Sequence, residues 1–313
     1  MTMIEQPFRF GIELRESFES KTWFDSVRHV EALGYSTMFV PDHFDEGLGP
    51  IAAMASAVAV TTELNVGPLV LDCDFRHPAI LARELASIDQ ISSGRLEVGL
   101  GAGWKRLDYD QSGITMDPPK VRVDRMIEHA AVLRGLFSEE AFTFRGDHYQ
   151  ISELNGTPKS FRAEGPKFLI GGGGRRVLRY AATHADIIGV NASIHSGAID
   201  TAAAQDALLE SIDEKVAWVR EAAGVALATK EINAWLSIAE VTEDRTGLAT
   251  ALAAAFSSTP ENVVDSPLVL IGNATQIIEQ LQRRRTRWGY NYIVIPGDRA
   301  DVFAPIVAEL TGK

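Results

Sequence analysis

The sequence predicts a single (β/α)₈ barrel, or TIM barrel, with loop insertions, spanning residues 1–313. Three observations predict it: strand-like and helix-like runs alternate along the whole chain, eight such pairs follow one another, and no shift in composition marks a linker. Repeated β-then-α units imply parallel strands joined by right-handed crossovers. Eight units at this length favour a closed barrel, which typically takes about 250 residues. An open, doubly wound sheet is the alternative.

The first half of the chain supplies four strand–helix pairs. Phe8–Leu14 is apolar and β-rich, and the apolar residues of Thr22–Leu33 fall on one helical face ahead of Gly34, a typical helix terminator. Pro78 suits the first turn of a helix. The other strands are expected at Thr37–Val40, Leu64–Leu71 and Leu96–Leu100, and the other helices at Pro50–Val60, Pro78–Ile91 and Val121–Leu136.

The second half supplies four more pairs and two insertions. Phe142–Ile151, with Gly146 at its turn, is expected to form a hairpin lid, and Leu268–Gly272 a small extra strand before the helix Ala274–Arg285. The strands are expected at Phe168–Gly171, Ile187–Val190, Ile232–Glu240 and Tyr292–Pro296, and the helices at Arg175–Thr183, Ala204–Ala223 and Val302–Leu310.

Composition excludes several classes of function. The net charge of -12 disfavours nucleic acid as a partner. No apolar run reaches the roughly 20 residues of a membrane helix, and Met1–Phe10 does not read as a signal peptide. The single cysteine, Cys73, rules out an internal disulfide framework, and we expect it to be a small buried residue. These features predict a soluble cytoplasmic protein.

Catalytic residues of a parallel barrel lie where a strand ends and its loop begins. Of the seven histidines, His43 alone directly follows a predicted strand. Histidine titrates near neutrality, so His43 is predicted to give or take a proton there. Asp42 beside it either bonds a cofactor hydroxyl or sets the turn. No HExxH sequence or cluster of carboxylates and histidines indicates a catalytic metal.

Two glycine runs also follow predicted strands. Gly99–Gly103, before Trp104, would let the backbone approach a ligand, although tight packing is an alternative reason for it. Its GxGxG spacing is not a dinucleotide fingerprint, because no helix follows promptly. Gly171–Gly174 runs directly into a helix that begins Arg175-Arg176, which predicts an anion site at the helix N-terminus. A solvated turn is the alternative there.

The direction of the chain sorts the basic residues between the two ends of the barrel. Arg283–Arg285 and Arg287 end a descending helix, so they are expected at the bottom, opposite the active site, in a structural role. Arg175 and Arg176 begin one, so they belong at the top. Arg76, Lys105 and Arg106 follow strands and are also expected there, which predicts a basic rim on an acidic protein.

Several of these motifs, in this order, resemble the luciferase-like monooxygenase superfamily and, more narrowly, its coenzyme F420-dependent oxidoreductases. The likeness covers nearly the whole chain. It is carried by Asp42-His43-Phe44, by His77-Pro78-Ala79 through Asp89, by Ser92-Ser93-Gly94-Arg95, by Gly99 to Trp104, by Ile170 to Gly174, by Ser266 to Gly272 and by the strand Tyr292–Pro296. The resemblance implies a barrel whose mouth holds F420 or, alternatively, FMN.

The resemblance also implies roles for single residues. Asp42 would contact the deazaflavin, and His43 would be the catalytic proton donor or acceptor. Leu69–Val70 would form a non-proline cis peptide under the ring. The remaining cofactor contacts that it implies are Asp72 and the backbone of Ala102 and Gly103, with Gly174, Arg175, Val177 and Leu178 on the phosphate side.

The sequence departs from the family at Trp104. The F420-dependent sugar-phosphate dehydrogenases carry a glutamate at this point, so the sugar-phosphate reaction is disfavoured and an aromatic wall for an apolar or planar substrate is expected. Asp108 is the polar group nearby that could replace the glutamate.

The resulting hypothesis is an F420-dependent oxidoreductase that transfers hydride between the cofactor and a small organic substrate. An FMN-dependent monooxygenase is the first alternative, and a catalytically idle ligand-binding barrel is the second. A deazaflavin cannot form the oxygen adduct that a flavin forms, so the choice of cofactor decides the reaction class. Barrels of this kind often pair through helix faces, so a homodimer is one arrangement that the sequence leaves open.

Overall fold

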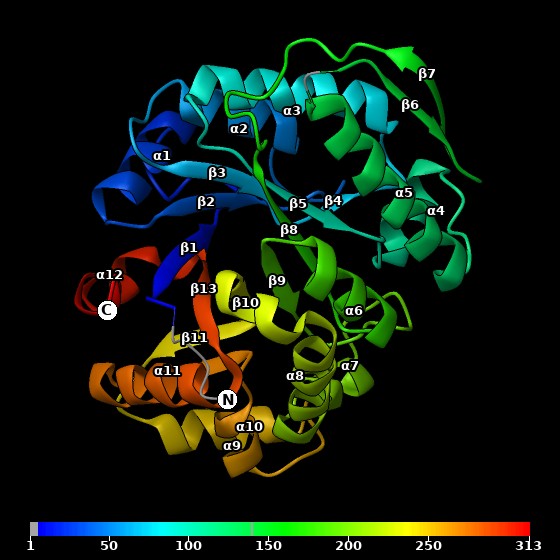
Figure 1. The fold of residues 1–313 in the computed structure, drawn as a ribbon. Helices are drawn as coiled ribbons and strands as arrows, with labels where there is room; N and C mark the ends of the chain where they lie inside the picture. Colours follow the sequence, from blue (N-terminus) through cyan, green and yellow to red (C-terminus); the bar gives the residue numbers. More distant parts are fainter. Residues whose placement is uncertain (1–5, 139) are drawn as a thin grey trace.

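Parallel strands form the wall of a barrel in the computed structural model, which describes residues 6–138 and 140–313 (Figure 1). Around the wall the strands neighbour one another in the order β3-β2-β1-β13-β10-β9-β8-β5-β4. Their bounds are β1 (Arg9–Glu13), β2 (Thr37–Val40), β3 (Asn65–Pro68), β4 (Leu71–Asp72), β5 (Glu97–Gly101), β8 (Lys167–Gly172), β9 (Ile187–Val190), β10 (Glu231–Trp235) and β13 (Tyr290–Pro296).

The barrel closes where β3 and β4 share one position in the wall. The predicted strand Leu64–Leu71 is interrupted at Leu69–Val70, whose peptide bond is cis, as the resemblance implied. β4 pairs with β5 through Leu71 and Leu100, and a parallel bridge joins Val66 to Leu96, so the last strand meets the first part of the sheet. The predicted barrel is therefore confirmed, and the open sheet is rejected.

The predicted helices surround this wall. Thr22 caps the first of them by accepting a hydrogen bond from the Asp25 N–H, and Gly34 follows it with a φ of 84°. Pro78 lies in the first turn of its helix, as expected. The helices of the barrel are α1 (Trp23–Ala32), α2 (Pro50–Val58), α3 (Pro78–Ser92), α5 (Pro119–Phe137), α6 (Arg175–His184), α8 (Leu209–Ala223), α11 (Ala274–Trp288) and α12 (Ala300–Leu310).

The sequence did not predict the short helices in the loops. The expected helix Ala204–Ala223 is two helices, because the chain turns between Asp206 and Leu209. These additional elements are α4 (Arg106–Ser112), α7 (Thr201–Asp206), α9 (Arg245–Ala253), α10 (Pro260–Asp265) and the 3₁₀ turns η1 (Gly224–Thr229) and η2 (Gly297–Arg299).

The expected strand Ile232–Glu240 leaves the barrel wall halfway along. The Leu236 N–H donates to the Val294 carbonyl of β13, whereas the next residue, Ser237, donates to the Leu268 carbonyl. The chain continues as β11 (Ile238–Val241), which pairs in parallel with β12 (Val269–Gly272). The small extra strand at Leu268–Gly272 is confirmed, while the single long strand is replaced by β10 and β11.

The expected hairpin is present, but it lies along the outside of the barrel. β6 (Phe142–Arg145) and β7 (Gln150–Leu154) pair antiparallel. The Glu128 carboxylate of α5 accepts hydrogen bonds from three N–H groups of its turn, residues 147–149. Those contacts fix the hairpin beside α5 (Figure 1), so the predicted lid over the strand ends is not formed.

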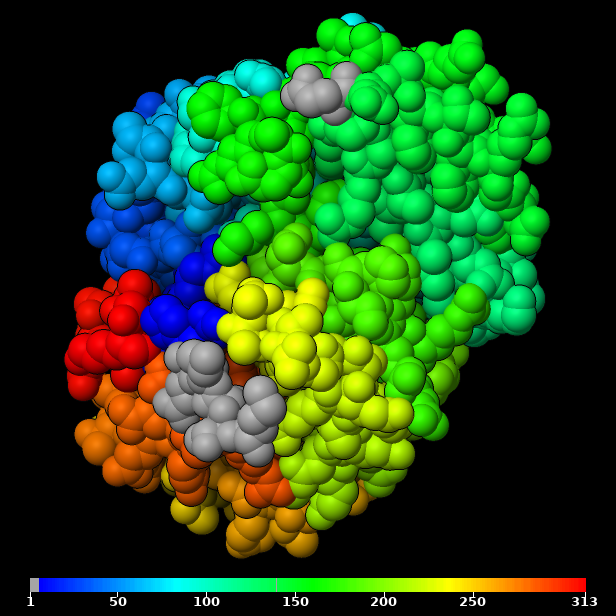
Figure 2. All heavy atoms as spheres, viewed as in Figure 1, coloured from blue at the N-terminus to red at the C-terminus, as the bar shows by residue number. Residues whose placement is uncertain are grey.

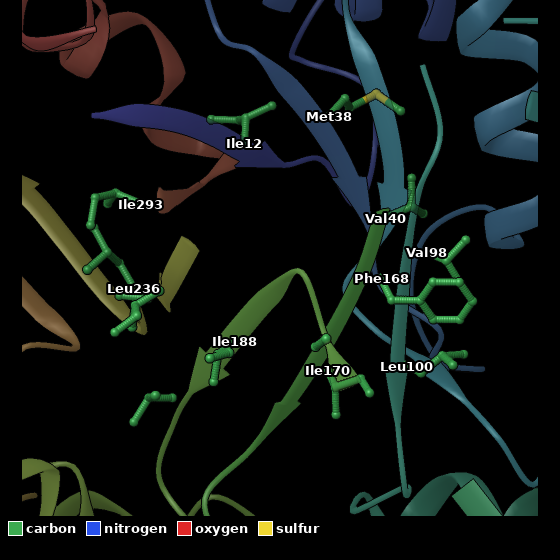
Figure 3. Packing of buried hydrophobic residues seen from close by; sticks show 14 of the residues in the cluster. Ile12, Met38, Val40, Val98, Leu100, Phe168, Ile170, Ile188, Leu236 and Ile293 are labelled. Atoms are coloured by element: carbon green, nitrogen blue, oxygen red, sulfur yellow. The ribbon is translucent and has the colours of Figure 1, made fainter. Parts of the chain in front are cut away.

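Alternate residues of each strand pack on opposite sides of the wall. Side chains such as Ile12, Met38 and Ile188 pack outward against the helices (Figure 3). Their neighbours in sequence fill the barrel interior instead, where the cluster comprises Phe39, Leu169, Ile187, Tyr292 and Val294.

At the end where the strands begin, a polar cluster occupies the barrel interior. Arg9 bonds Glu97 and Glu231 and lies 3.7 Å from the centre of the Tyr292 ring, whose hydroxyl donates to Glu97 at 2.9 Å.

Chain segments far apart in sequence meet on the face in Figure 2, where blue, yellow and red segments lie side by side. There Gln6 bonds the Ala228 carbonyl, and the Phe8 N–H donates to the carbonyl of Lys313.

Candidate active site

His43 is held from two sides just after β2. Its Nδ1 lies 2.6 Å from Oδ2 of Asp108, and the Trp104 ring stands edge-on to the imidazole with centroids 5.4 Å apart. The other oxygen of Asp108 accepts a hydrogen bond from the Phe44 N–H at 3.2 Å. The structure thus brings together His43 and Trp104, both predicted from sequence, with Asp108, which lies on the unpredicted helix α4.

Asp42 is already bonded within the loops. Its two oxygens accept hydrogen bonds from the Arg76 guanidinium at 2.6 and 2.9 Å, and one of them also accepts from the Asp72 N–H at 3.1 Å. Asp42 is buried. Its carboxylate therefore ties the loop after β2 to the segment after β4, which favours its alternative role as a loop-setting aspartate.

Asp72, like Asp42, joins two chain segments through its carboxyl group. One of its oxygens accepts a hydrogen bond from the Asp74 N–H at 2.9 Å, and the other lies 2.7 Å from the Tyr109 hydroxyl. Burial raises the pKa of Asp72 to about 7. The same Tyr109 hydroxyl lies 3.0 Å from Oδ2 of Asp74, and one hydroxyl hydrogen cannot serve two carboxylates. A protonated Asp72 resolves this conflict, because its own hydrogen can be donated to Tyr109 while Tyr109 donates to Asp74.

The glycines at the end of β5 are required by packing. At Gly103, which has a φ of 71°, a Cβ would collide with the Tyr109 hydroxyl and the Asp72 carboxylate. Side chains at Gly99 and Gly101 would collide with Pro68 and Val70 of the interrupted strand. The glycine run therefore lets β5 and its loop lie close to the β3–β4 segment, in agreement with the tight-packing alternative.

Arg122, at the start of α5, holds the loop after β5 in place. Its guanidinium donates to the carbonyls of Ala102 and Gly103 and, through Nε, to the carbonyl of Asp117. Sequence reasoning missed this buried arginine. A signal was available, since Arg122 occupies the same helical face as the buried Met126 and Leu133.

The N-terminus of α6 has free donors. No side chain caps it, and a Cβ at its N-cap residue, Gly174, would meet nothing within 4 Å. Helix geometry leaves the first N–H groups, those of Arg175, Arg176 and Val177, without an intrahelical acceptor. Leu178 does not join them, because its N–H donates to the Gly174 carbonyl at 3.0 Å and its side chain is in the core. The N–H groups of Arg175, Arg176 and Val177 are therefore suited to binding an anion such as phosphate.

Within the described parts of the chain, three of the five basic residues predicted for the rim are ion-paired, and the exceptions are Arg106 and Arg175. Besides Arg76, which pairs with Asp42, Lys105 bonds Asp45 at 2.5 Å and Arg176 pairs with Asp124 of α5. Arg175 is exposed and lies 5.8 Å from the centre of the Trp218 ring, and no ion pair joins it to an acidic residue of segments 6–138 and 140–313. Arg175 is therefore the cation best placed to meet a ligand at α6.

The arginines predicted for the other end of the barrel lie there. The buried Arg284 guanidinium donates to the carbonyls of Val264, Ser266 and Val269, close to where β12 begins. Arg287 pairs with Asp213 at 2.5 Å. Both residues make contacts within the protein, with the segment before β12 and with α8 rather than with the carbonyl groups at the carboxyl end of their own helix.

The loop that follows β9 crosses the mouth toward α4. The Arg106 N–H donates to the Gly197 carbonyl at 3.0 Å. The base of the loop is fixed by Lys215 of α8, a buried residue whose ammonium donates to the Asn191 carbonyl at 3.0 Å and to Asp206 at 2.5 Å. Sequence reasoning missed Lys215, which lies inside a predicted helix and has no motif around it.

The strands β1 and β10 add a buried pair at the same end of the barrel. The Trp235 indole N–H donates to the carboxyl group of Glu13, and Arg15 lies 2.7 Å from the other Glu13 oxygen. Burial raises the pKa of Glu13, although Arg15 acts against this shift. Trp104 and Trp235 give the mouth two aromatic side chains.

Two other features of the described residues concern a metal site and a membrane-spanning helix. Within residues 6–138 and 140–313, no three or more histidine, cysteine or acidic residues are grouped so that they could hold a metal ion. None of the described helices is both long and apolar enough to cross a membrane.

Comparison with known proteins identifies relatives with both kinds of cofactor. The chain is 30% identical over 192 residues to an FMNH₂-dependent dimethylsulfone monooxygenase of Pseudomonas fluorescens, which is 59% of this chain and 50% of that protein. It is 29% identical over 181 residues to an F420-dependent glucose-6-phosphate dehydrogenase of Intrasporangium calvum, which is 55% of this chain and 54% of that protein. The chain thus spans about half the length of these relatives.

The fold also matches a solved structure over its full length. The coenzyme F420-dependent tetrahydromethanopterin reductase from Methanopyrus kandleri superposes with a TM-score of 0.76, covering 98% of this chain and 99% of that chain at 16% identity. Residues 15–291 match the model of the family described as luciferase-like monooxygenase. Barrel, site and this match together show that the chain belongs to the luciferase-like monooxygenase family.

Proposed function

We propose that this protein is an F420-dependent oxidoreductase that transfers hydride between the deazaflavin and a small, apolar or planar organic substrate. The observation that carries the proposal is His43, whose imidazole is fixed by Asp108 and Trp104 at the end of β2. Reduction of a carbonyl, or oxidation of an alcohol, moves one proton together with the hydride. His43 supplies a group of suitable chemistry for that proton.

The N-terminus of α6 and Arg175 would hold the phosphate of the cofactor. They fit it because the helix is uncapped, Gly174 leaves open space, and Arg175 has no acidic partner in the described parts of the chain. Val70, whose side chain packs with the barrel interior, and the backbone of Ala102 and Gly103 would lie against the ring. When bound, F420 supplies a two-electron hydride donor or acceptor.

The chain's own residues would do the remaining work. His43 would hold or release a proton at Nε2, because Nδ1 faces Asp108. Trp104 would form an apolar wall beside this nitrogen, and the loop pinned by Lys215 would help to exclude water from the mouth. Asp42 and Asp72 would support the site by bracing its loops.

An FMN-dependent monooxygenase is the second candidate. It is favoured by the relative that uses FMNH₂, and the α6 site suits the single phosphate of FMN equally well. The two candidates differ in chemistry, since only the flavin would use molecular oxygen.

Binding of F420 and of FMN to the purified apoprotein, measured side by side, tests the proposal. We expect F420 to bind at least about tenfold more tightly, a difference of about 1.4 kcal/mol. Equal affinities, or FMN that copurifies tightly with the protein, would reject the F420 assignment.

A substrate panel follows the binding test. Oxidised F420 is mixed with primary and secondary alcohols, and reduced F420 with ketones, enones and aldehydes, while the deazaflavin absorbance is followed. We expect turnover of an apolar or planar member of the panel. Tight F420 binding without turnover of any member would favour the idle ligand-binding barrel.

A further inference from the structure

We propose that Asp108 is a positioning residue that decides which nitrogen of His43 carries the hydrogen. The two oxygens of Asp108 have different partners, His43 Nδ1 at 2.6 Å and the Phe44 N–H at 3.2 Å. The side chain of Asp108 is only 3% exposed, so water does not compete for these bonds. The position of the hydrogen on His43 is inferred from these contacts alone. The effect of Asp108 on turnover rests on the proposed function.

An ionised carboxylate can only accept hydrogen bonds. A neutral imidazole has one N–H and one bare nitrogen, so the hydrogen must lie on Nδ1 when it faces Asp108. Nε2 is then the bare nitrogen and the one ring position that can take a proton from a ligand. After it does so, Asp108 stabilises the imidazolium, in the manner of the aspartate in a serine-protease triad.

The surroundings of His43 support this assignment. Lys105 engages Asp45, the other nearby acid, and the hydrogen bond from Lys105 is the main cause that lowers the pKa of Asp45. Trp104 stands edge-on to the imidazole, at 85°, and restricts its rotation. Asp108 is therefore the carboxylate that contacts His43, and the ring is held with Nδ1 toward it.

His29 provides an internal reference. It contacts Asp301 through the opposite ring nitrogen, Nε2, at 2.7 Å. Two histidine–aspartate pairs in one chain are thus predicted to have opposite tautomers. Imidazole ¹⁵N chemical shifts, recorded at a pH where both rings are neutral, distinguish protonated from bare nitrogens without any ligand.

The variant Asp108→Asn is expected to reverse the tautomer of His43. The Phe44 N–H still needs an acceptor, so the amide oxygen stays with it and the NH₂ group faces His43. The NH₂ group can only donate, so Nδ1 must become the bare nitrogen and the hydrogen must move to Nε2. The matched control is Asp110→Asn, which removes the same charge from an exposed residue of the same helix.

We expect the wild type to show a protonated Nδ1 at His43 and Asp108→Asn to show a protonated Nε2. On the panel substrate that the wild type turns over fastest, Asp108→Asn should lower kcat by about tenfold or more. The Kd for F420 should stay within about twofold, because the residue does not face the α6 site. Asp110→Asn should leave the spectrum, kcat and Kd unchanged.

Two results would overturn the proposal. One is a wild-type His43 that carries its hydrogen on Nε2, which is measured without any variant and so does not depend on the folding of Asp108→Asn. The other is an Asp108→Asn variant with an unchanged tautomer. A reversed tautomer with wild-type kcat would instead support the positioning role and reject the proton-transfer role of His43 in the proposed function.

Discussion

The two sides of the barrel mouth differ in how completely their polar groups are bonded. On the side built by β2, β4 and β5, the buried carboxylates Asp42, Asp72 and Asp108 each have two or more hydrogen-bond partners. On the side built by β8 and α6, the helix N-terminus has no side-chain cap, and Arg175 has no acidic partner in the described parts of the chain. The first side is braced by the protein itself, whereas the second would be completed by a ligand.

This difference shows why residue type at a strand end is an incomplete guide to function. Asp42 and Asp72 have the chemistry and position of ligand contacts, yet both are occupied by partners within the protein. His43 differs from them because one ring nitrogen stays outside the braced network. The comparison leads to four predictions, beginning with the largest effect.

Replacing His43 with alanine tests whether the side of the mouth built by β2, β4 and β5 provides the proton-transfer group. Loss of an acid/base group should lower turnover by roughly 10²–10⁴-fold. The Kd for F420 should change by less than about twofold, because the proposed anion site is on the other side. Steady-state kinetics and fluorescence titration check both values. His29→Ala removes a histidine that contacts Asp301 and Phe18 rather than the residues of the proposed site, and it serves as the control. Wild-type turnover in His43→Ala would show that His43 does not transfer the proton.

Replacing Gly103 with alanine tests how tightly the braced side is packed. The new Cβ would displace the Tyr109–Asp72 pair, and we expect the free energy of unfolding to fall by about 3 kcal/mol. Gly113→Ala is the matched control, since Gly113 has a similar φ of 75° but nothing within 4 Å of its Cβ position. It should cost only about 1 kcal/mol from backbone strain. Urea unfolding curves measure both, and equal losses would show that packing plays no part.

Replacing Asp72 with asparagine tests whether this buried carboxyl is protonated. Burial raises its pKa from 3.8 to about 7 in the folded protein. Between these values the folded state holds a proton that the unfolded state has released, so this group's contribution to stability is lost as pH rises toward 7. From pH 5 to pH 8, the wild type should lose about 3 kcal/mol more than Asp72→Asn does. Parallel losses in denaturant unfolding would show that Asp72 is ionised throughout.

Replacing Arg175 with alanine tests the open side of the mouth. We expect the Kd for F420 to rise by about tenfold, or about 1.4 kcal/mol, and its salt dependence to decrease. Arg176→Ala should have a smaller effect, because Arg176 is paired with Asp124. Arg283→Ala removes an exposed arginine at the opposite end and should change Kd by less than about twofold. An equal loss for Arg175 and Arg283 would indicate a general charge effect.

The fold was predictable where the pattern is local. The bounds of β2 and β9 agree with the expected runs, because continuous apolar strands between helices are typical of a buried parallel sheet. The exit of the chain from the wall between Leu236 and Ser237 was not predictable. It depends on two carbonyls distant in sequence, those of Val294 and Leu268, and nothing in the local pattern distinguishes them.

The site was predictable only in part. The rule that catalytic residues follow strands selects His43, and the glycine run before Arg175 selects the α6 N-terminus. Asp108 lies on a seven-residue helix whose sequence has no periodic signal, so its contact with His43 emerges only from the fold. Leu178, which the resemblance implies on the phosphate side, has its N–H bonded to the Gly174 carbonyl and its side chain in the core.

The pairing of β1 with β13 has a consequence for synthesis of the chain. Arg9 pairs with Tyr292, so β1 cannot complete its pairing in the barrel until β13 has been translated. At about 5–20 residues per second this wait is roughly 15–60 s, during which β1 and β10 each have an unpaired edge. Slow translation of the segment between β10 and β13 would prolong that interval and favour aggregation of nascent chains, whereas a chaperone that covers β1 would protect them.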